Sequence, residues 1–233
     1  KYYALVNSDI EITSQWLQPI IEMMEKDPTI AAVQPRILAE SKRGYFEYAG
    51  AAGGFMDSLG YPFCRGRVLQ NLERDTGQYE SAIPIFWASG AALVIRNYKI
   101  MSCPQSVVYH VGGGTLSYSS PEKIYLNFRN NLITLFKYLP KPDFIPVVSL
   151  RWIFDGFAGL RFMAKGQFAN AFAIIRAHYY IYGHIRSILQ KRKDLGEEFT
   201  RQPLAKLPGV YQGSIIMDYY LRWKRKFSDL FPS

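Results

Sequence analysis

The first third of the chain alternates between short β-prone runs and one helical pattern. Residues 2–6 form a continuous apolar run, which predicts a strand buried on both faces of a sheet. Ser14 is the expected N-cap of a helix that runs to about Lys26, where Asp27-Pro28 ends it. Residues 30–33 predict the next strand. The apolar face of the helix comprises Trp16, Leu17, Ile20, Ile21 and Met24. Strand, helix and strand in this order predict a right-handed parallel βαβ unit and an α/β fold class.

The middle of the chain is expected to be irregular and then to return to strands. Residues 40–86 are rich in glycine and predict loops. Residues 83–86, 91–95 and 107–109 predict short strands that lead up to His110.

From Pro121 onward the pattern turns helical. Residues 147–193 predict one or two amphipathic helices that carry many aromatic side chains. Because prolines at 140, 142 and 146 mark a boundary, we expect an α/β domain over 1–139 and a helical region over 140–233.

Composition and charge separate these two regions further. The chain has 233 residues, of which 48% are hydrophobic and 20% charged, which excludes disorder, collagen and coiled coil. Residues 1–136 carry 12 basic and 12 acidic residues, whereas residues 137–233 carry 16 and 7. The excess positive charge therefore lies in the C-terminal region and points to a polyanion or an anionic membrane surface as partner. Aromatic residues there are spaced for one helix face and no recognition motif is evident, which disfavours nucleic acid.

Cysteine content and hydropathy add two expectations. Cys64 and Cys103 are far apart and match no metal-binding spacing, so we expect two reduced, buried thiols. Apolar runs stay well short of the roughly 20 residues that span a bilayer.

Three short segments could carry chemistry. Asn7-Ser8-Asp9 follows the first strand, where a carboxylate can hold Mg²⁺ or Mn²⁺; the alternative is an Asp that closes a turn. His110 precedes Gly112-Gly113-Gly114, whose backbone N–H groups could approach phosphate oxygens; the alternative is a structural His. The segment Trp87-Ala88-Ser89-Gly90 could lie against a sugar or an aliphatic chain; the alternative is core packing.

Together and in order, these segments resemble the family 2 glycosyltransferases, in particular the bacterial rhamnosyltransferase-like branch. Asn7-Ser8-Asp9 is similar to the family's DxD motif, and residues 87–96 are similar to its W-x-S/T-G-A-x-x-x-x-R segment. Tyr109-His110 with its glycines resembles the H-x-x-G loop, and Phe128-Arg129-Asn130-Asn131 resembles the R-N step that opens a C-terminal helix. The resemblance covers roughly residues 2–190.

The resemblance implies a GT-A fold, a mixed sheet flanked by helices, with residues 140–233 as an amphipathic helical extension. It implies metal binding by Asp9 and His110 to Mg²⁺ or Mn²⁺. It further implies donor contacts from Asn7, Ser8, Gly112 and Gly113, and an acceptor side at Trp87, Ser89 and Gly90. The reaction would be an inverting transfer of a sugar from a nucleotide-sugar to a lipid-linked or polysaccharide acceptor in cell-envelope glycan synthesis. The enzyme would lie in the cytoplasm, peripheral on the inner face of the plasma membrane.

Two parts of the family pattern have no counterpart in this sequence. One is the first βαβ half, which holds the donor nucleoside, before Lys1. The other is the E-D pair that supplies the general base, because no Asp or Glu occurs between Glu80 and Glu122. Arg96 runs directly into Asn97, and we expect a segment to be missing near 96–97; the catalytic base stays unassigned. Two alternatives to the enzyme remain: a non-catalytic peripheral membrane-binding module, or an inactive glycosyltransferase remnant.

Overall fold

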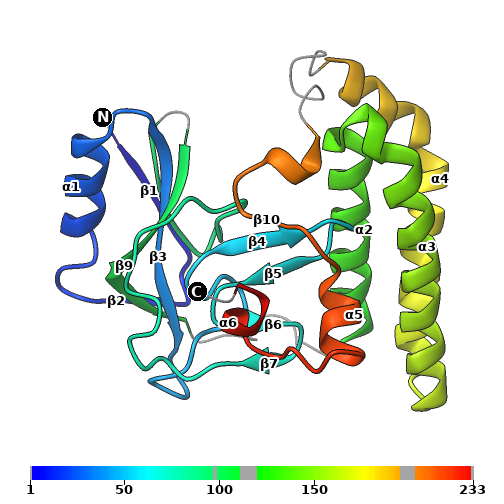
Figure 1. Cartoon of the computed structure of the whole chain (residues 1–233), viewed down its shortest axis with the longest axis horizontal. Coiled ribbons are helices and arrows are strands. Elements are labelled where there is room, and N and C mark those ends of the chain that lie inside the picture. Colours follow the sequence, from blue (N-terminus) through cyan, green and yellow to red (C-terminus); the bar gives the residue numbers. More distant parts are fainter. Residues whose placement is uncertain (1, 97–98, 111–119, 195–202, 232–233) are drawn as a thin grey trace. The chain divides into compact units, whose positions relative to one another are not determined.

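The computed structural model describes residues 2–96, 99–110, 120–194 and 203–231 as a mixed α/β protein with two compact units (Figure 1). Unit 1 takes its residues from 1–57, 62–112 and 208–233, and unit 2 takes them from 58–61 and 113–207. This grouping differs from the expected division after residue 139 in two ways: residues 113–139 belong to the helical unit, and the chain returns to unit 1 after residue 207. The junction near 96–97, where we expect a missing segment, lies partly outside the described residues.

Unit 1 contains a five-stranded mixed sheet in the order β1-β8-β3-β9-β2. Its strands are β1 (Tyr3–Val6), β2 (Ile10–Ile12), β3 (Ile30–Ala39), β8 (Ala92–Ile95) and β9 (Lys99–His110). Strand β3 pairs parallel to β9 and antiparallel to β8, and β1 also pairs antiparallel to β8. Strands β1, β3 and β9 therefore run in the same direction. Strands β1 and β3, which correspond to the predicted strands over 2–6 and 30–33, are parallel as expected, but β8 lies between them.

Strand β1 corrects one expectation from the sequence. All four of its residues are exposed, including Tyr3 at 57% and Leu5 at 48%, so the predicted burial on both faces is wrong. The physical reason is topological: β1 is an edge strand, and β8 is its one partner in the described sheet. An apolar run alone does not distinguish an edge strand from a central one.

Helix α1 (Gln18–Lys26) covers part of this sheet, and Ile20, Ile21 and Met24 of the predicted apolar face pack in the core, as does Trp16 just before the helix. Leu17 does not, because it lies before the helix and is 38% exposed. Ile20 and Met24 are fully buried and pack with residues of β3, β8 and β9. The predicted N-cap at Ser14 is wrong, because the helix begins at Gln18 with Leu17 as its N-cap residue. Pro19 explains the late start, since proline is favoured in the first helical turn.

A second five-stranded sheet takes four of its strands from the segment predicted to be loop-rich and the fifth from near the C-terminus. It has the order β10-β4-β5-β6-β7. The strands are β4 (Gly54–Asp57), β5 (Pro62–Cys64), β6 (Arg67–Val68), β7 (Asn71–Leu72) and β10 (Val210–Tyr211). Strands of two to four residues between glycines give no alternating pattern, so the sequence missed them. The predicted strand over 83–86 forms one isolated bridge instead, between Pro84 and Met101.

The C-terminal segment packs on this second sheet within unit 1. After β10 it forms α5 (Ile215–Tyr220) and α6 (Phe227–Leu230). The ring of Phe227 contacts those of Phe55 and Phe63, with centroids 4.8 and 6.1 Å apart. This segment contains a cluster of basic residues within Arg222–Lys226, which therefore belongs to unit 1 rather than to the helical region expected over 140–233.

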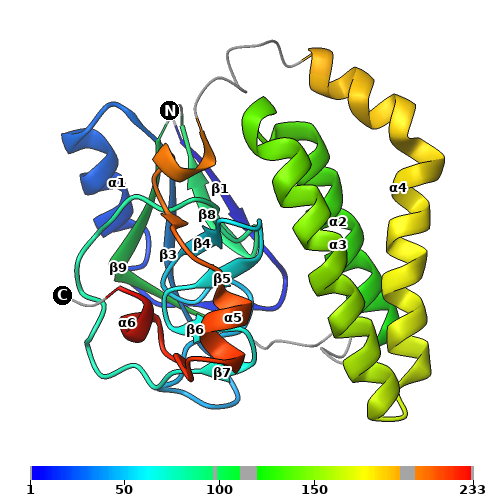
Figure 2. The same ribbon diagram turned by 45° about the vertical axis from the view of Figure 1, so that its right-hand side comes forward.

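Unit 2 consists mainly of three long helices, drawn in green to orange in Figure 2. They are α2 (Pro121–Tyr138), α3 (Lys141–Ala164) and α4 (Phe168–Asp194), followed by the 3₁₀ turn η2 (Leu204–Lys206). Residues 147–193, predicted to form one or two helices, lie in two, α3 and α4. Leu132 and Phe136 of α2 pack with Ile181 and Ile188 of α4.

Candidate functional site

Several of the predicted site residues lie close together at the end of the first sheet where its parallel strands finish. Strands β1, β3 and β9 all end there, because they run in the same direction. The register places His110 of β9 opposite Ala39 of β3 on one side and Ile10 of β2 on the other. Ligands of open α/β sheets bind beyond the carboxyl ends of such strands.

The side chains of Asp9 and His110 meet at this edge. Asp9 Oδ2 lies 3.3 Å from His110 Nε2. The His110 side chain is 9% exposed, whereas that of Asp9 is 35% exposed. The carboxylate therefore faces solvent, and the imidazole lies beneath it.

A second carboxylate, which the sequence analysis missed, lies on the other ring nitrogen. Glu47 Oε1 is 3.3 Å from His110 Nδ1, and the Glu47 side chain is only 4% exposed. The backbone N–H of Glu47 donates to the carbonyl of Ile37 in β3 at 3.0 Å. Its carboxylate also accepts a hydrogen bond from the backbone N–H of Ala49. Glu47 is thus fixed to the sheet and aimed at His110.

This arrangement fits a divalent cation on the solvent side of His110. Two ligand atoms that share one cation at about 2.1 Å each lie roughly 3 Å apart, close to the separation seen between Asp9 and His110. Histidines that bind a metal through one nitrogen usually direct the other toward a carboxylate, the position that Glu47 holds. Among the described residues no group of three or more His, Cys, Asp or Glu is placed to hold a metal ion. A cation here would therefore take its other ligands from water or from donor oxygens, as Mg²⁺ commonly does.

The structure describes two of the four predicted donor-side residues, Asn7 and Ser8. Asn7 lies next to the start of β8, because its backbone N–H donates to the carbonyl of Ala91 at 2.9 Å. The side chains of Asn7 and Ser8 are exposed. Gly112 and Gly113 lie outside the described residues.

The predicted acceptor-side residues differ in how accessible they are. The Trp87 ring lies directly over Gly54, where an added Cβ would come within 2.1 Å of it, and its indole N–H donates to the carbonyl of Phe55 at 2.8 Å. Trp87 is half-buried and packs on β4, which favours the core-packing alternative. Gly90 is exposed, with open space where a side chain would be.

Ser89 is held by a residue that the sequence analysis missed, Gln34 of β3. Gln34 is fully buried; its amide oxygen accepts from the N–H of Ser89 at 2.7 Å, and its amide nitrogen donates to the carbonyl of Gly50 at 3.0 Å. Ser89 also packs against Gly50, whose added Cβ would lie 2.7 Å from the Ser89 Cβ. Gln34 thus links β3 to the segment at Gly50 and to the segment at Ser89.

The R-N step lies in unit 2, on α2. The guanidinium of Arg129 lies over the rings of Tyr125 and Tyr180, 5.3 Å from each centroid. Asn131 donates to the carbonyl of Gly60 at 2.8 Å. These contacts give the step a structural role within the helical unit.

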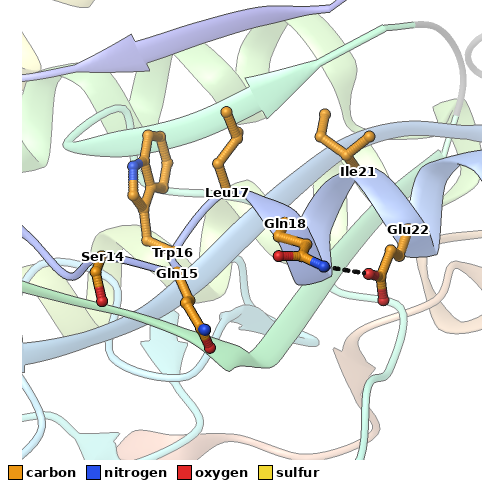
Figure 3. Close-up of a pocket in the computed structure, with 7 residues that line it drawn as sticks. All are labelled: Ser14, Gln15, Trp16, Leu17, Gln18, Ile21 and Glu22. Atoms are coloured by element: carbon orange, nitrogen blue, oxygen red, sulfur yellow. Dashed lines mark hydrogen bonds between the residues drawn. The ribbon is translucent and has the colours of Figure 1, made fainter.

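A depression of about 530 Å³ lies elsewhere in unit 1, at the start of α1 (Figure 3). Ser14, Trp16 and Leu17 contribute to its lining, and Gln18 donates to Glu22 one turn further along α1 at 2.9 Å. Because it contains none of the predicted site residues, it offers no support for the chemistry expected from the sequence.

Comparison with known proteins does not assign a family. The chain matches no model of a known protein family, and a search of curated proteins finds no significant relative. Within the described part of the chain, each helix is too short or too polar to cross a bilayer.

Proposed function

We propose that this protein is a metal-dependent inverting glycosyltransferase of the GT-A type, related to family 2. It moves a sugar from a nucleotide-sugar donor to a lipid-linked or polysaccharide acceptor in cell-envelope glycan synthesis. It works in the cytoplasm at the inner face of the plasma membrane. The proposal rests on the resemblance of the motifs and on one observation that supports it in the structure.

That observation is the row Asp9, His110 and Glu47 at the carboxyl edge of the sheet. The two contacts, both 3.3 Å, join a solvent-facing carboxylate, a buried imidazole and a buried carboxylate. A structural histidine needs no carboxylate on each nitrogen, whereas a metal ligand commonly has one on the nitrogen away from the metal. Asp9 has the most exposed side chain of the three, so a ligand can reach the row from its side.

In this proposal the chain's own residues bind and orient the donor. Asp9 Oδ2 and His110 Nε2 would hold the cation, and Glu47 would keep Nδ1 protonated and the ring aligned. Mg²⁺ or Mn²⁺ bound there would neutralise charge on the leaving nucleoside diphosphate. Asn7 and Ser8 precede Asp9 in the chain and are exposed, and in this proposal their polar side chains would contact the donor. The general base is not assigned, because no carboxylate occurs over residues 81–121.

The test is Mn²⁺-dependent binding of nucleoside diphosphates. Titration of the full chain with UDP, GDP and dTDP, with Mn²⁺ and with EDTA, should show binding of at least one that requires Mn²⁺. Asp9→Asn should weaken Mn²⁺ binding at least tenfold, because it removes a charged oxygen ligand.

Glu11→Gln is the matched control, since Glu11 lies two residues away on β2 and pairs with Arg43 at the surface. It removes the same charge and should leave Mn²⁺ affinity within about twofold. Equal losses of Mn²⁺ affinity in the two variants would mean that the change in net charge alone causes the effect, which would contradict the proposed cation site.

The alternative class is a non-catalytic membrane-binding module. It requires neither a cation nor a nucleotide at Asp9 and His110. Absence of any Mn²⁺-dependent nucleotide binding, together with intact vesicle binding, would favour this alternative over the enzyme.

A further inference from the structure

Two helices of unit 2 leave large apolar side chains in solvent. We define the α3–α4 face by Trp152, Phe157 and Leu160 of α3 and by Phe172, Ile175 and Tyr179 of α4. The exposed fractions reach 62% for Phe157, 64% for Phe172 and 71% for Tyr179. Contiguous apolar surface of this kind marks an interaction site in soluble proteins.

This face is additional to the core of unit 2. Ile174, Ala177 and Ile181 form the buried side of α4, with 3%, 0% and 2% exposure. Phe172, Ile175 and Tyr179 recur at spacings of three and four residues, so they form a second apolar row on the same helix. Core packing therefore accounts for one row and leaves the other unexplained.

The face is also hollowed. A groove of about 650 Å³ lies within unit 2, and all the residues of the face apart from Phe172 line it. His178 and Asp155 are its polar lining residues, and they contact each other at 3.1 Å. The rest of its lining is glycine, aliphatic or aromatic, which suits a hydrocarbon chain.

Basic residues outnumber acidic ones on the two helices that carry the face. Residues 141–194 contain nine basic and three acidic residues, and Asp155, one of the acidic ones, is buried against Arg151. Arg161, in the last turn of α3, and Lys165, its C-cap residue, are exposed. Arg186 is exposed seven residues after Tyr179, so it continues the aromatic row of α4. Aromatic and basic side chains on one face are typical of helices that lie in the interface of an anionic bilayer.

We propose that the α3–α4 face docks on an anionic lipid bilayer. The apolar side chains enter the interface, lipid chains fill the groove, and the exposed Arg and Lys side chains contact acidic headgroups. The occupant is inferred from charge complementarity, because an uncharged partner would not explain the basic residues that border the face. This inference rests on the membrane location in the proposed function and deepens it, but it does not depend on the cation site at Asp9 and His110.

Vesicle co-sedimentation of the full chain tests the proposal. Binding should be at least tenfold tighter to vesicles of phosphatidylcholine with phosphatidylglycerol than to phosphatidylcholine alone, and should weaken with salt. The double substitution Phe172→Glu and Tyr179→Glu should lower the partition coefficient at least tenfold, because it places two carboxylates in the apolar row.

The matched control is Leu221→Glu with Trp223→Glu in unit 1. These side chains are 69% and 70% exposed, so the control adds the same charge and removes similar apolar surface elsewhere. It should keep vesicle binding within about threefold. An equal loss in both double variants would overturn the assignment to the α3–α4 face.

A second copy of this chain is the competing occupant. Sedimentation velocity without lipid distinguishes it: a dimer that Phe172→Glu dissociates, with vesicle binding unchanged, would overturn the proposal.

A measurement on the unaltered chain covers the case in which the variants misfold. Brominated lipids should quench part of the tryptophan fluorescence, and Trp152→Phe should remove most of the quenched part. Failure of brominated anionic vesicles to quench the wild-type chain would also overturn it.

Discussion

His110 shows how one residue type acquires different properties from its neighbours. Its ring lies between the carboxylates of Asp9 and Glu47, at 3.3 Å from each. His184, in contrast, stacks on Tyr180 with centroids 4.0 Å apart and is exposed. At the residue scale, it is the pair of carboxylates that sets His110 apart and makes it the candidate metal ligand.

The role of Glu47 gives the first prediction at this scale. Glu47→Gln should lower Mn²⁺ affinity about 10- to 100-fold, because an amide orients the imidazole less well and reduces its basicity. Electron paramagnetic resonance of free Mn²⁺ measures this directly. Glu47→Asp should recover part of the affinity, which loss of packing alone would not explain.

The control again is Glu11→Gln, and the wild-type melting temperature serves as the reference for folding. Unchanged Mn²⁺ affinity in Glu47→Gln, with Asp9→Asn still impaired, would contradict the positioning role and leave the cation site standing. Loss of affinity in neither variant would instead contradict the cation site itself.

Sequence reasoning located Asp9 and His110 but not Glu47 or Gln34. The first two follow apolar runs at strand ends, where a polar residue is conspicuous. Glu47 lies in a glycine-rich segment, and only the chain's return to Ile37 places it beside His110. Gln34 interrupts an otherwise buried strand, and its polar side chain was the available signal that a partner was required.

At the scale of elements, a buried polar cluster joins the parts of unit 2. Asp155 of α3 accepts hydrogen bonds from Arg151 on the same helix and from Tyr61, at 2.9 and 2.8 Å. Its other oxygen contacts His178 of α4 at 3.1 Å. Arg151 also donates to the carbonyl of Gly60 at 3.1 Å. The cluster therefore ties α3 to α4 and to the segment Ser58–Tyr61.

This cluster predicts a pH dependence of stability. Burial by itself would raise the pKa of Asp155, but the charge of Arg151 and the hydrogen bonds from His178 and Tyr61 lower it overall. A lowered pKa in the folded state adds stability above the unfolded value of about 3.9, and this stability is lost as the pH falls through the folded pKa. Asp155→Asn should reduce the free energy of unfolding by about 3 kcal/mol at pH 7, because it leaves Arg151 buried without its counter-charge. Urea unfolding at pH 7 and at pH 3 measures the difference, which should shrink at the lower pH.

Asp194→Asn is the control for this prediction. Asp194 is exposed near the end of α4 and accepts a hydrogen bond from Gln190 at 2.9 Å. Its substitution should change the unfolding free energy by less than about 0.5 kcal/mol. A difference between Asp155→Asn and wild type that stays constant from pH 7 to pH 3 would contradict the assigned pKa direction.

Element prediction succeeded where periodicity was long and failed where it was short. Helices α2, α3 and α4 follow clear helical patterns over 18, 24 and 27 residues. Pro146, treated as part of a boundary, instead lies inside α3 near its start. Strands β6 and β7 have two residues each and depend on pairing with one another rather than on any pattern of their own.

At the scale of the whole molecule, the chain's order does not follow its compact units. Residues after 207 return to unit 1, where β10 adds to the second sheet beside β4. Phe227 is 7% exposed, and its N–H donates to Glu73 at 2.8 Å. This C-terminal segment is therefore part of the core of unit 1.

Truncation of Phe227, which holds the C-terminal segment in the core, should destabilise unit 1. Phe227→Ala should lower the free energy of unfolding by about 3 kcal/mol, because it leaves a cavity among Phe55, Phe63 and Tyr79. Trp223→Ala, at a side chain that is 70% exposed in the same segment, should change it by less than about 0.5 kcal/mol. Denaturant unfolding compares the two; equal effects would mean that the segment does not pack as described.

The sequence by itself determined the mixed α/β class, the apolar face of α1, the long helices and the strand-end positions of Asp9 and His110. These features follow from local periodicity and from the residues that begin and end each element. Only the tertiary structure decided that β1 is an exposed edge, that residues 208–231 pack in unit 1 and that Glu47 lies beside His110. Each of these depends on pairing between residues far apart in the chain, and such pairing leaves no pattern in a single sequence.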